Sequence, residues 1–404
     1  MFYGWRVVAG AFTAQLFSVG FFTYAVSMLV VPVREEFGVS LEQVMYSLTA
    51  AMFLGLVIQP LAGIMVDRIS VRAMMIAGTA IFGLGLLATS YSTSIGQYIL
   101  FFAVTMSLVT ALNGPLCTSA VISRWFTASR GKALGIAAMG TSLGGVALPA
   151  LIGWGLADGG WRTSLQLLAW VVVLVMLPVV TLTIRGRPTD VNLDTEPMPT
   201  DSTAMPGQES HMDMKDILRS SRFWLIGLSL GLLFGAYSTT LANLTPFAIN
   251  LGETAERAAT LIMCIAVSGF FGKILFGMAA DKFSLKSSLW AAQGLVVAAL
   301  LILATEPQYT LMLLGAGSLG LAAGGMLPVW GAMMAQAFGL ASYGRAMGLM
   351  GPIITLCILP AYPLVGRLYD TTGSYTTGLY IFAAVTAVAA ALLVPLRFTP
   401  RAGV

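Results

Sequence analysis

The sequence predicts an all-α membrane protein with twelve transmembrane helices in two pseudo-symmetric six-helix bundles. Three observations lead to this prediction: an apolar composition, twelve apolar runs of membrane-spanning length, and a motif that recurs half a chain apart. Hydrophobic residues make up 57% of the 404 residues and charged residues only 9%, and the mean hydropathy is +0.87. A soluble chain of this length needs roughly 25% charged residues. The composition therefore excludes soluble enzymes and nucleic-acid binders.

The apolar runs define the expected spans. A membrane helix needs about 20 mostly apolar residues to cross roughly 30 Å of hydrocarbon. The first run is too long for the core of a cleavable signal peptide, so we expect it to be a retained span. The twelve runs are 7–33, 44–66, 72–90, 97–122, 133–156, 163–184, 222–249, 258–280, 287–305, 309–337, 346–367 and 375–396.

A polar segment separates six spans from six. Residues 185–221 are rich in Pro, Asp, Ser and Thr and too poor in large apolar residues to bury a core. We therefore predict an N-terminal bundle at 1–184, a cytoplasmic linker at 185–221 and a C-terminal bundle at 222–404. Near the end of the linker, the stretch from position 212 to position 224 is expected to form a short interfacial helix. The residues expected to face lipid or protein there are Met214, Ile217 and Leu218.

The distribution of lysine and arginine predicts the orientation. When the loops are assigned to alternate sides, one face carries Arg34, Arg162, Arg257 and Arg367, and Lys273 falls inside a span. The other 16 of the 21 basic residues lie on the face that holds both termini and the linker. The positive-inside rule places that face in the cytoplasm. We expect a bacterial-type inner membrane with both termini cytoplasmic.

A repeat relates the two halves. The loop after the second span reads GIMVDRISVR at 63–72, and the loop after the eighth reads GMAADKFSLK at 277–286. Both fit G-x-x-x-D-[RK]-x-S-x-[RK], 214 positions apart. A second match relates RGKALG at 130–135 to YGRAMG at 343–348. Two copies at the half-chain spacing indicate two parallel six-span halves with one ancestral pattern.

These features resemble the major facilitator superfamily of secondary transporters, and the resemblance covers the whole chain. It implies the major facilitator fold and alternating access. Three further features are FYGWRVV near the start, RWFTASRGKALGIAAMGTSLGG at 124–145, and one basic residue, Lys273, four positions before the glycine of the eighth-span motif. In these features the chain is similar to the monocarboxylate carrier and oxalate/formate antiporter group.

Lys273 is the main candidate for substrate binding. Placing an ammonium group in hydrocarbon costs at least about 2.5 to 3.5 kcal/mol on insertion scales. All 17 acidic residues fall in loops or at span ends, so we expect a substrate carboxylate to supply the balancing charge. A desolvated lysine also gives up its proton readily, which makes Lys273 the candidate for proton coupling. In the alternative, Lys273 lies near the cytoplasmic interface and is held by backbone carbonyls and water.

The sequence departs from the monocarboxylate group at this position. The group usually has arginine here, often with an aspartate one turn earlier, whereas this chain has Lys273 and Gly269. Some members carry a further lysine in the first or eleventh span, and this chain carries none there. Because these residues differ, the resemblance gives weaker support for assigning the proton-coupling mechanism of the group to this chain. The difference also argues against a dicarboxylate, because one cation balances one carboxylate.

Polar and aromatic side chains inside other spans are the next candidates, since a cavity wall must offer hydrogen-bond donors. Tyr237, Thr240 and Asn243 recur at three-residue steps and share one helical face. Gln15 is a further polar candidate. Each could instead bond or pack against a neighbouring helix. Besides Lys273, the predicted substrate-binding residues are Asn113, Tyr237, Asn243, Tyr24, Trp330, Thr355 and Tyr362.

The resemblance assigns the cytoplasmic gate to the charged loops. In the superfamily, the loop aspartate and its basic neighbour tie the halves together when the cavity opens outward. A carboxylate docked at the positive end of a facing helix makes a favourable, breakable contact. Rocking of the halves then exposes a midplane site to each side in turn. The predicted gating residues are Asp67, Arg68, Arg72, Arg130, Asp281, Lys282 and Arg345.

The leading interpretation is a secondary transporter of a small organic monocarboxylate, with a proton as candidate coupling ion. The expected partners are the anionic substrate and membrane lipid, and we expect a monomer. One alternative is an exporter or exchanger of larger amphipathic molecules, and another is a membrane receptor that kept the transporter scaffold.

The chain has one histidine, His211, and no phosphate-cradling loop, so neither an enzyme nor an ATP-driven pump is expected. Its three separated cysteines predict no metal or cofactor site.

Overall fold

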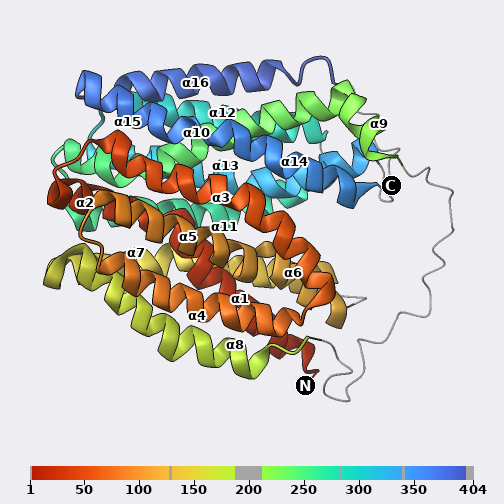
Figure 1. Ribbon diagram of the computed structural model, residues 1–404. Helices are drawn as coiled ribbons and strands as arrows, with labels where there is room; N and C mark the ends of the chain where they lie inside the picture. Colours follow the sequence, from red (N-terminus) through yellow and green to blue (C-terminus); the bar gives the residue numbers. More distant parts are fainter. Residues whose placement is uncertain (1, 127–129, 187–211, 283, 339–341, 397–404) are drawn as a thin grey trace. The chain divides into compact units, whose positions relative to one another are not determined.

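The structure, a computed structural model of the chain, describes residues 2–126, 130–186, 212–282, 284–338 and 342–396 (Figure 1). Within these ranges every regular element is a helix, which confirms the predicted all-α fold. The elements, in chain order, are α1 (Gly4–Gly20), η1 (Phe21–Ala25), η2 (Val26–Leu29), α2 (Val30–Phe37), α3 (Leu41–Arg68), α4 (Val71–Ser90), α5 (Ile95–Asn113), α6 (Pro115–Trp125), α7 (Arg130–Val171), η3 (Val172–Met176), α8 (Leu177–Thr183), α9 (Met214–Arg219), α10 (Ser221–Asn250), α11 (Ala255–Lys282), α12 (Leu285–Ala304), α13 (Tyr309–Phe338), α14 (Tyr343–Ile358), α15 (Ala361–Thr372) and α16 (Thr376–Ala391).

The chain divides into two compact units. The first comprises Met1–Thr203 with Thr254–Met263, and the second comprises Ala204–Glu253 with Cys264–Val404. The first unit therefore holds α1 to α8, and the second holds α9, α10 and α12 to α16, while α11 begins in the first group and ends in the second. The predicted division into two bundles around a linker at 185–221 stays a prediction.

The helices are consistent with the twelve predicted crossings. Ten described helical stretches are long and apolar enough to span a membrane, and Thr376–Ala391 is a shorter apolar helix. One stretch, Ala133–Thr183, is 51 residues long, or about 77 Å at 1.5 Å per residue, far more than one crossing needs. It is interrupted at Gly159 and Gly160, and the φ of Gly160 is +79°, a left-handed conformation that glycine adopts without strain. The predicted fifth and sixth spans lie on either side of this turn.

Several predicted spans are not regular helices: the sixth contains a π-helical turn at Val172–Met176, the eleventh is interrupted between α14 and α15, and the first and fourth change as follows. The first, Gly4–Phe37, changes from α-helix to a π-helical turn at Phe21–Ala25 and a 3₁₀ turn at Val26–Leu29. The fourth breaks at Gly114, which has extended backbone, and Pro115 is the first residue of the helix that follows. A proline fits the first helical position because its missing N–H would have no intrahelical partner there. Such local changes of helix type are frequent at functional sites.

The two units repeat the same helix pairings. In the first unit α1 packs against α7, and α4 packs against α5; in the second α10 packs against α14, and α12 packs against α13. These pairs occupy corresponding places in the two halves of the sequence. Close approach in the first unit depends on glycine, since a Cβ at Gly20 would lie 2.9 Å from the Cα of Gly144. The repeat predicted from the loop motifs is therefore visible in the packing.

The last basic residue of each loop motif donates hydrogen bonds to the C-terminal end of its own unit, in the last helix or in the turns just after it. In the first unit an Nη2 of Arg72 donates to the carbonyl of Thr181, in α8, at 3.1 Å. In the second unit Lys286 Nζ donates to the carbonyls of Val394 and Leu396 at 2.7 and 3.1 Å. Thr181 lies in the last turn of α8, whose carbonyls have no intrahelical partner and carry partial negative charge, so a cation there is stabilising. Val394 and Leu396 lie in the turns that follow α16, where Lys286 likewise pairs their carbonyls. The motif thus has one structural role, repeated 214 positions apart.

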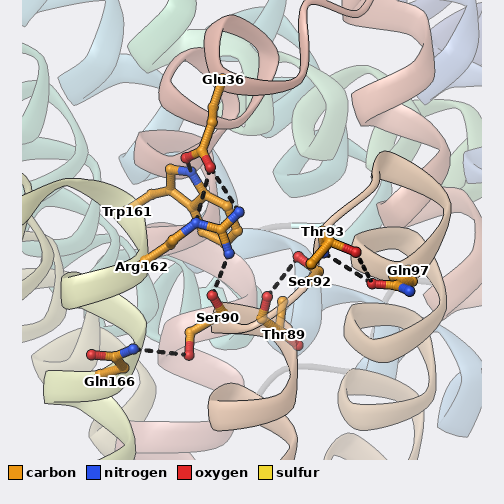
Figure 2. A network of polar contacts seen from close by, with 9 residues as sticks. All are labelled: Glu36, Thr89, Ser90, Ser92, Thr93, Gln97, Trp161, Arg162 and Gln166. Atoms are coloured by element: carbon orange, nitrogen blue, oxygen red, sulfur yellow. Dashed lines mark hydrogen bonds and ion pairs between the residues drawn. The ribbon is translucent and has the colours of Figure 1, made fainter.

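A polar network joins three elements at one end of the first unit (Figure 2). Arg162 donates through Nε and Nη2 to Glu36 Oε1, at 2.9 and 2.7 Å, and also to the carbonyl of Ser90. The indole of Trp161 donates to the other oxygen of Glu36. Gln166 donates to the hydroxyl of Ser90 at 3.4 Å. Because these residues come from α2, α4 and α7, the network connects three predicted spans where they meet their loops.

We predict that replacing Arg72 or Lys286 with glutamine lowers the apparent melting temperature of the detergent-solubilised protein by a few degrees. Each change removes a cationic donor from carbonyls in the last helix of a unit or just after it, a loss of about 1 kcal/mol. Thermal unfolding monitored by circular dichroism measures the effect. Arg367→Gln is the matched control, because Arg367 is exposed and no side-chain hydrogen bond is recorded for it among the described residues. Equal melting temperatures for all three variants and the parent protein would contradict the assignment.

Candidate functional site

Lys273 lies within a membrane-spanning helix, as predicted. It belongs to α11, whose candidate span is Ala255–Phe276, and its side chain is half-buried. At about 100° per residue, Lys273 shares a face with the fully buried Ala266, two turns earlier. The strongly exposed side chains of this part of α11, Phe271 and Ile274, point to other sides of the helix. The lysine is thus placed on a packed face.

The backbone at Lys273 is held by close contact with α13. A Cβ added to Gly324 would lie 2.5 Å from the backbone nitrogen of Lys273 and 2.6 Å from the carbonyl carbon of Gly272. One turn earlier on α13, a Cβ at Gly320 would overlap Ser268 and the carbonyl of Ile265. No side chain separates the two helices here, so α13 fixes the position of Lys273 through backbone packing.

Trp330 and Tyr362 contact the same side of α10. The Trp330 ring, on α13, packs edge-on against Phe234 with the centroids 6.2 Å apart. Its indole N–H is buried and has no hydrogen-bond partner among the described residues. Tyr362, on α15, is buried and shares a hydrogen bond with the side chain of Ser238. Phe234 and Ser238 are one turn apart, so these two predicted binding residues flank one face of α10.

Asn243 belongs to a different part of the second unit. It lines a small pocket with Thr240, as the predicted shared face requires, and its Nδ2 donates to the carbonyl of Thr239 at 2.9 Å. Tyr237, the third member of that face, is buried but does not line the pocket. The walls are otherwise apolar or aromatic and come from α10, α12, α15, α16 and the turn before α16: Leu244, Phe247, Leu303, Val365, Tyr375, Leu379 and Phe382.

Of the remaining candidates, Thr355 hydrogen-bonds its own helix and Asn113 hydrogen-bonds a neighbouring helix. Thr355 Oγ1 donates to the carbonyl of Gly351 in its own helix at 3.0 Å. Asn113 is fully buried, and in either amide orientation it hydrogen-bonds α4, through Thr79 at 3.3 Å. Tyr24 is buried on the π-helical turn of the first span. The substrate roles of these residues stay predictions, and the contacts of Asn113 favour the packing alternative.

Most of the predicted gating side chains lie outside the described part of the structure. These are Asp67, Arg68, Arg130, Asp281, Lys282 and Arg345. Arg72 is described, and its hydrogen bond to Thr181 lies within the first unit. Arg124, which the sequence did not single out, donates to the carbonyl of Val66 at 2.9 Å near the end of α3. Arg124 thus stabilises the helix end that carries the loop motif.

Sequence reasoning missed the glycines that position Lys273. Gly320 and Gly324 form a G-x-x-x-G pair on α13, the spacing at which two helices can approach closely. The same spacing was visible in the sequence. The sequence does not show which helix packs against this pair, since a G-x-x-x-G spacing does not specify its neighbour.

Comparison with known families identifies the chain. The profile of the Major Facilitator Superfamily matches residues 11–305. This chain belongs to the major facilitator superfamily. It is therefore an integral membrane transporter, and not an enzyme. A solved bacterial homologue of the human lysosomal transporter Spinster, inward-facing and unoccupied, matches with a TM-score of 0.70 at 16% identity over 96% of each chain. That likeness confirms the major facilitator fold.

Curated relatives of this transporter cover nearly its full length. It is 24% identical over 402 residues to monocarboxylate transporter 12 of Rattus norvegicus, covering 93% of this chain and 81% of the relative. It is 25% identical over 409 residues to monocarboxylate transporter 13 of Bos taurus, with 98% and 89% covered. It is also 25% identical over 389 residues to a fujikurins efflux protein of Gibberella fujikuroi, with 94% and 79% covered.

We predict that Gly324→Ala destabilises this transporter by about 2 kcal/mol, because the added methyl group meets backbone that cannot move aside. The measurement is the apparent melting temperature in detergent. Gly294→Ala is the matched control: Gly294 also lies inside a helix, and a Cβ there meets nothing within 4 Å. The control should be neutral or slightly stabilising, since alanine favours helix over glycine. Similar melting temperatures for the two variants would show that α11 and α13 are not in tight contact.

Proposed function

We propose that this transporter carries a small organic monocarboxylate by alternating access, and that Lys273 binds the carboxylate. The observation that carries the proposal is a cationic side chain on a packed face of a membrane-spanning helix, α11. Ionisable residues inside membrane spans are costly and mark substrate or ion pathways. A cation there favours an anionic substrate, because their attraction is strong where water is scarce.

The named relatives support the same substrate class. Monocarboxylate transporters 12 and 13 align over 93% and 98% of this chain, so the likeness is not confined to one span or loop. The identities of 24% and 25% leave the individual acid open. The charge count favours one carboxylate, because Lys273 is the single basic residue within 258–280 and none lies within 7–33.

The aromatic and polar residues around α10 are proposed to shape the rest of the binding region. Trp330 and Tyr362 flank one face of α10, and an indole N–H without a partner among the described residues can donate to a substrate oxygen. Thr355, Tyr237 and Asn243 are proposed contacts on neighbouring surfaces, as are Asn113 and Tyr24 in the first unit.

A proton is the proposed coupling ion, and Lys273 is its proposed carrier. A lysine that holds its proton only while the anion is bound moves one proton with each anion, which keeps transport electroneutral. We further propose cytoplasmic termini, a bacterial-type inner membrane and a monomeric carrier. The duplicated loop motif is proposed to form the cytoplasmic gate, through Asp67 and Arg68 in one half and Asp281 and Lys282 in the other.

Export of larger amphipathic molecules is the second candidate. It is favoured by the similarity to a fujikurins efflux protein over 94% of this chain. In that case the substrate would be selected by apolar contact, and its transport would depend on Trp330 and Phe234 more than on charge.

Uptake into proteoliposomes tests the proposal. Labelled lactate, pyruvate and oxalate are offered with the internal and external pH fixed separately. We predict uptake of the monocarboxylates, faster with an inward proton gradient. In Lys273→Gln, uptake falls at least about tenfold, because the lost charge-assisted hydrogen bond is worth about 1.5 to 3 kcal/mol.

Lys273→Arg is the matched control, since it keeps the charge and retains most of the uptake. Uptake is compared only between variants that share the melting temperature of the parent protein, and equal amounts of each protein are reconstituted. Unchanged uptake in Lys273→Gln removes Lys273 from the site. No uptake of any monocarboxylate, with export of a fluorescent amphipathic dye, favours the second candidate.

A further inference from the structure

The short helix before α10 has a cationic side opposite its buried side. On α9, Ile217 is fully buried, whereas Lys215 and Arg219 are exposed. Lys215 and Arg219 are one turn apart, so their side chains lie next to each other. Arg222, in the first turn of α10, is exposed as well. The three cations lie within eight consecutive positions.

Exposed apolar side chains adjoin this cationic side. Met214 is 53% exposed and Leu218 is 40% exposed. At about 100° per residue, both lie between the buried Ile217 and the cationic pair. An apolar strip beside a cationic strip is the pattern of a helix that lies in a membrane interface. Within the predicted stretch 212–224 a short helix is present at Met214–Arg219, with Ile217 buried and the other two apolar residues exposed, while its place at the interface stays a prediction.

Two tryptophans place this end of the second unit at the membrane interface. Trp224 is 43% exposed, and its indole N–H donates to the carbonyl of Leu218 at 2.7 Å. Trp290 is 38% exposed, and its indole N–H donates to the carbonyl of Ala390 at 3.0 Å. Tryptophan is enriched at the level of the lipid headgroups, where an amphipathic ring is favoured. Since Trp224 is bonded to α9 itself, α9 lies at that level.

The helix is fixed in place by contacts within the second unit. The backbone nitrogen of Met212 donates to the hydroxyl of Ser342, a fully buried residue just before α14, at 2.9 Å. The buried side chain of Ile217 and the hydrogen bond from Trp224 to Leu218 hold the rest of the helix. Because the helix is already folded and docked, binding a ligand on its outer side costs little ordering entropy.

We propose that α9 and the start of α10 form a binding site for the headgroups of anionic phospholipids. The phosphate accepts hydrogen bonds from Lys215, Arg219 and Arg222, and the apolar strip contacts the upper part of the acyl chains. No ion pair is recorded for these three cations within the described ranges. Asp213 and Asp216 reduce the net charge of the segment, but Asp216 lies on the far side of the cationic pair from the apolar strip.

The adjacent apolar strip favours a lipid over a soluble anion. A free phosphate or an acidic peptide would contact the cations alone and leave Met214 and Leu218 in water. A phospholipid matches both strips at once, because its charge and its apolar chains are joined at the same interface. The site is independent of the transported substrate, so it stands whether or not the monocarboxylate proposal holds.

Tryptophan quenching by brominated lipids tests the site. The full chain is reconstituted in phosphatidylcholine bilayers containing either brominated phosphatidylglycerol or brominated phosphatidylcholine. The contribution of Trp224 is the difference between the parent protein and Trp224→Phe. We expect this contribution to show about a fivefold preference for phosphatidylglycerol, as one favourable cationic contact gives. The preference should fall at high salt, because salt screens the attraction between exposed cations and an anionic headgroup.

In the triple variant, Lys215→Gln/Arg219→Gln/Arg222→Gln, the Trp224 contribution should lose its preference for phosphatidylglycerol. The matched control, Arg34→Gln/Arg257→Gln/Arg367→Gln, removes three cations elsewhere and should keep the preference. Equal quenching by both lipids in the parent protein overturns the proposal, as does a preference that survives in the triple variant. Added inorganic phosphate should not abolish the preference; if it does, the site binds phosphate and not lipid.

Discussion

The constraint that organises this protein is that backbone polar groups must be paired wherever hydrocarbon replaces water. Within the described ranges, helices meet this requirement internally, and side chains complete it where helices end. Arg72 donates to a carbonyl in the last turn of α8, Lys286 donates to carbonyls in the turns just after α16, and Arg124 donates to a carbonyl near the end of α3. Tryptophan N–H groups act in the same way at Trp224 and Trp290.

Much of the fold was predictable because membrane spans are long and uniformly apolar. The spans, the linker helix and the internal repeat follow from run lengths and from one duplicated motif. The irregularities were less predictable. The break at Gly114 had a signal in the adjacent Pro115, and the turn at Gly160 had one in its double glycine. The π-helical turn at Phe21–Ala25 had none, because its sequence is as apolar and as helix-compatible as its surroundings.

The candidate site was predictable in its chemistry and not in its geometry. A charged residue inside an apolar run stands out, so Lys273 could be found from the sequence alone. Polar residues such as Asn113 and Asn243 also stand out, but their contacts are with helix backbone and a neighbouring helix. Periodicity shows which residues share a face and not what that face meets. For the same reason Gly324, whose role depends on another helix, could not be assigned.

The fastening by Arg72 and Lys286 bears on how such a protein could arise. Each of these residues donates to the C-terminal end of its own unit, and neither contact requires a residue of the other half of the chain. A primordial gene for a single half would therefore have encoded such a contact already. Fusion of two copies would then have inherited two finished halves, and later divergence could alter the substrate pathway without rebuilding either one.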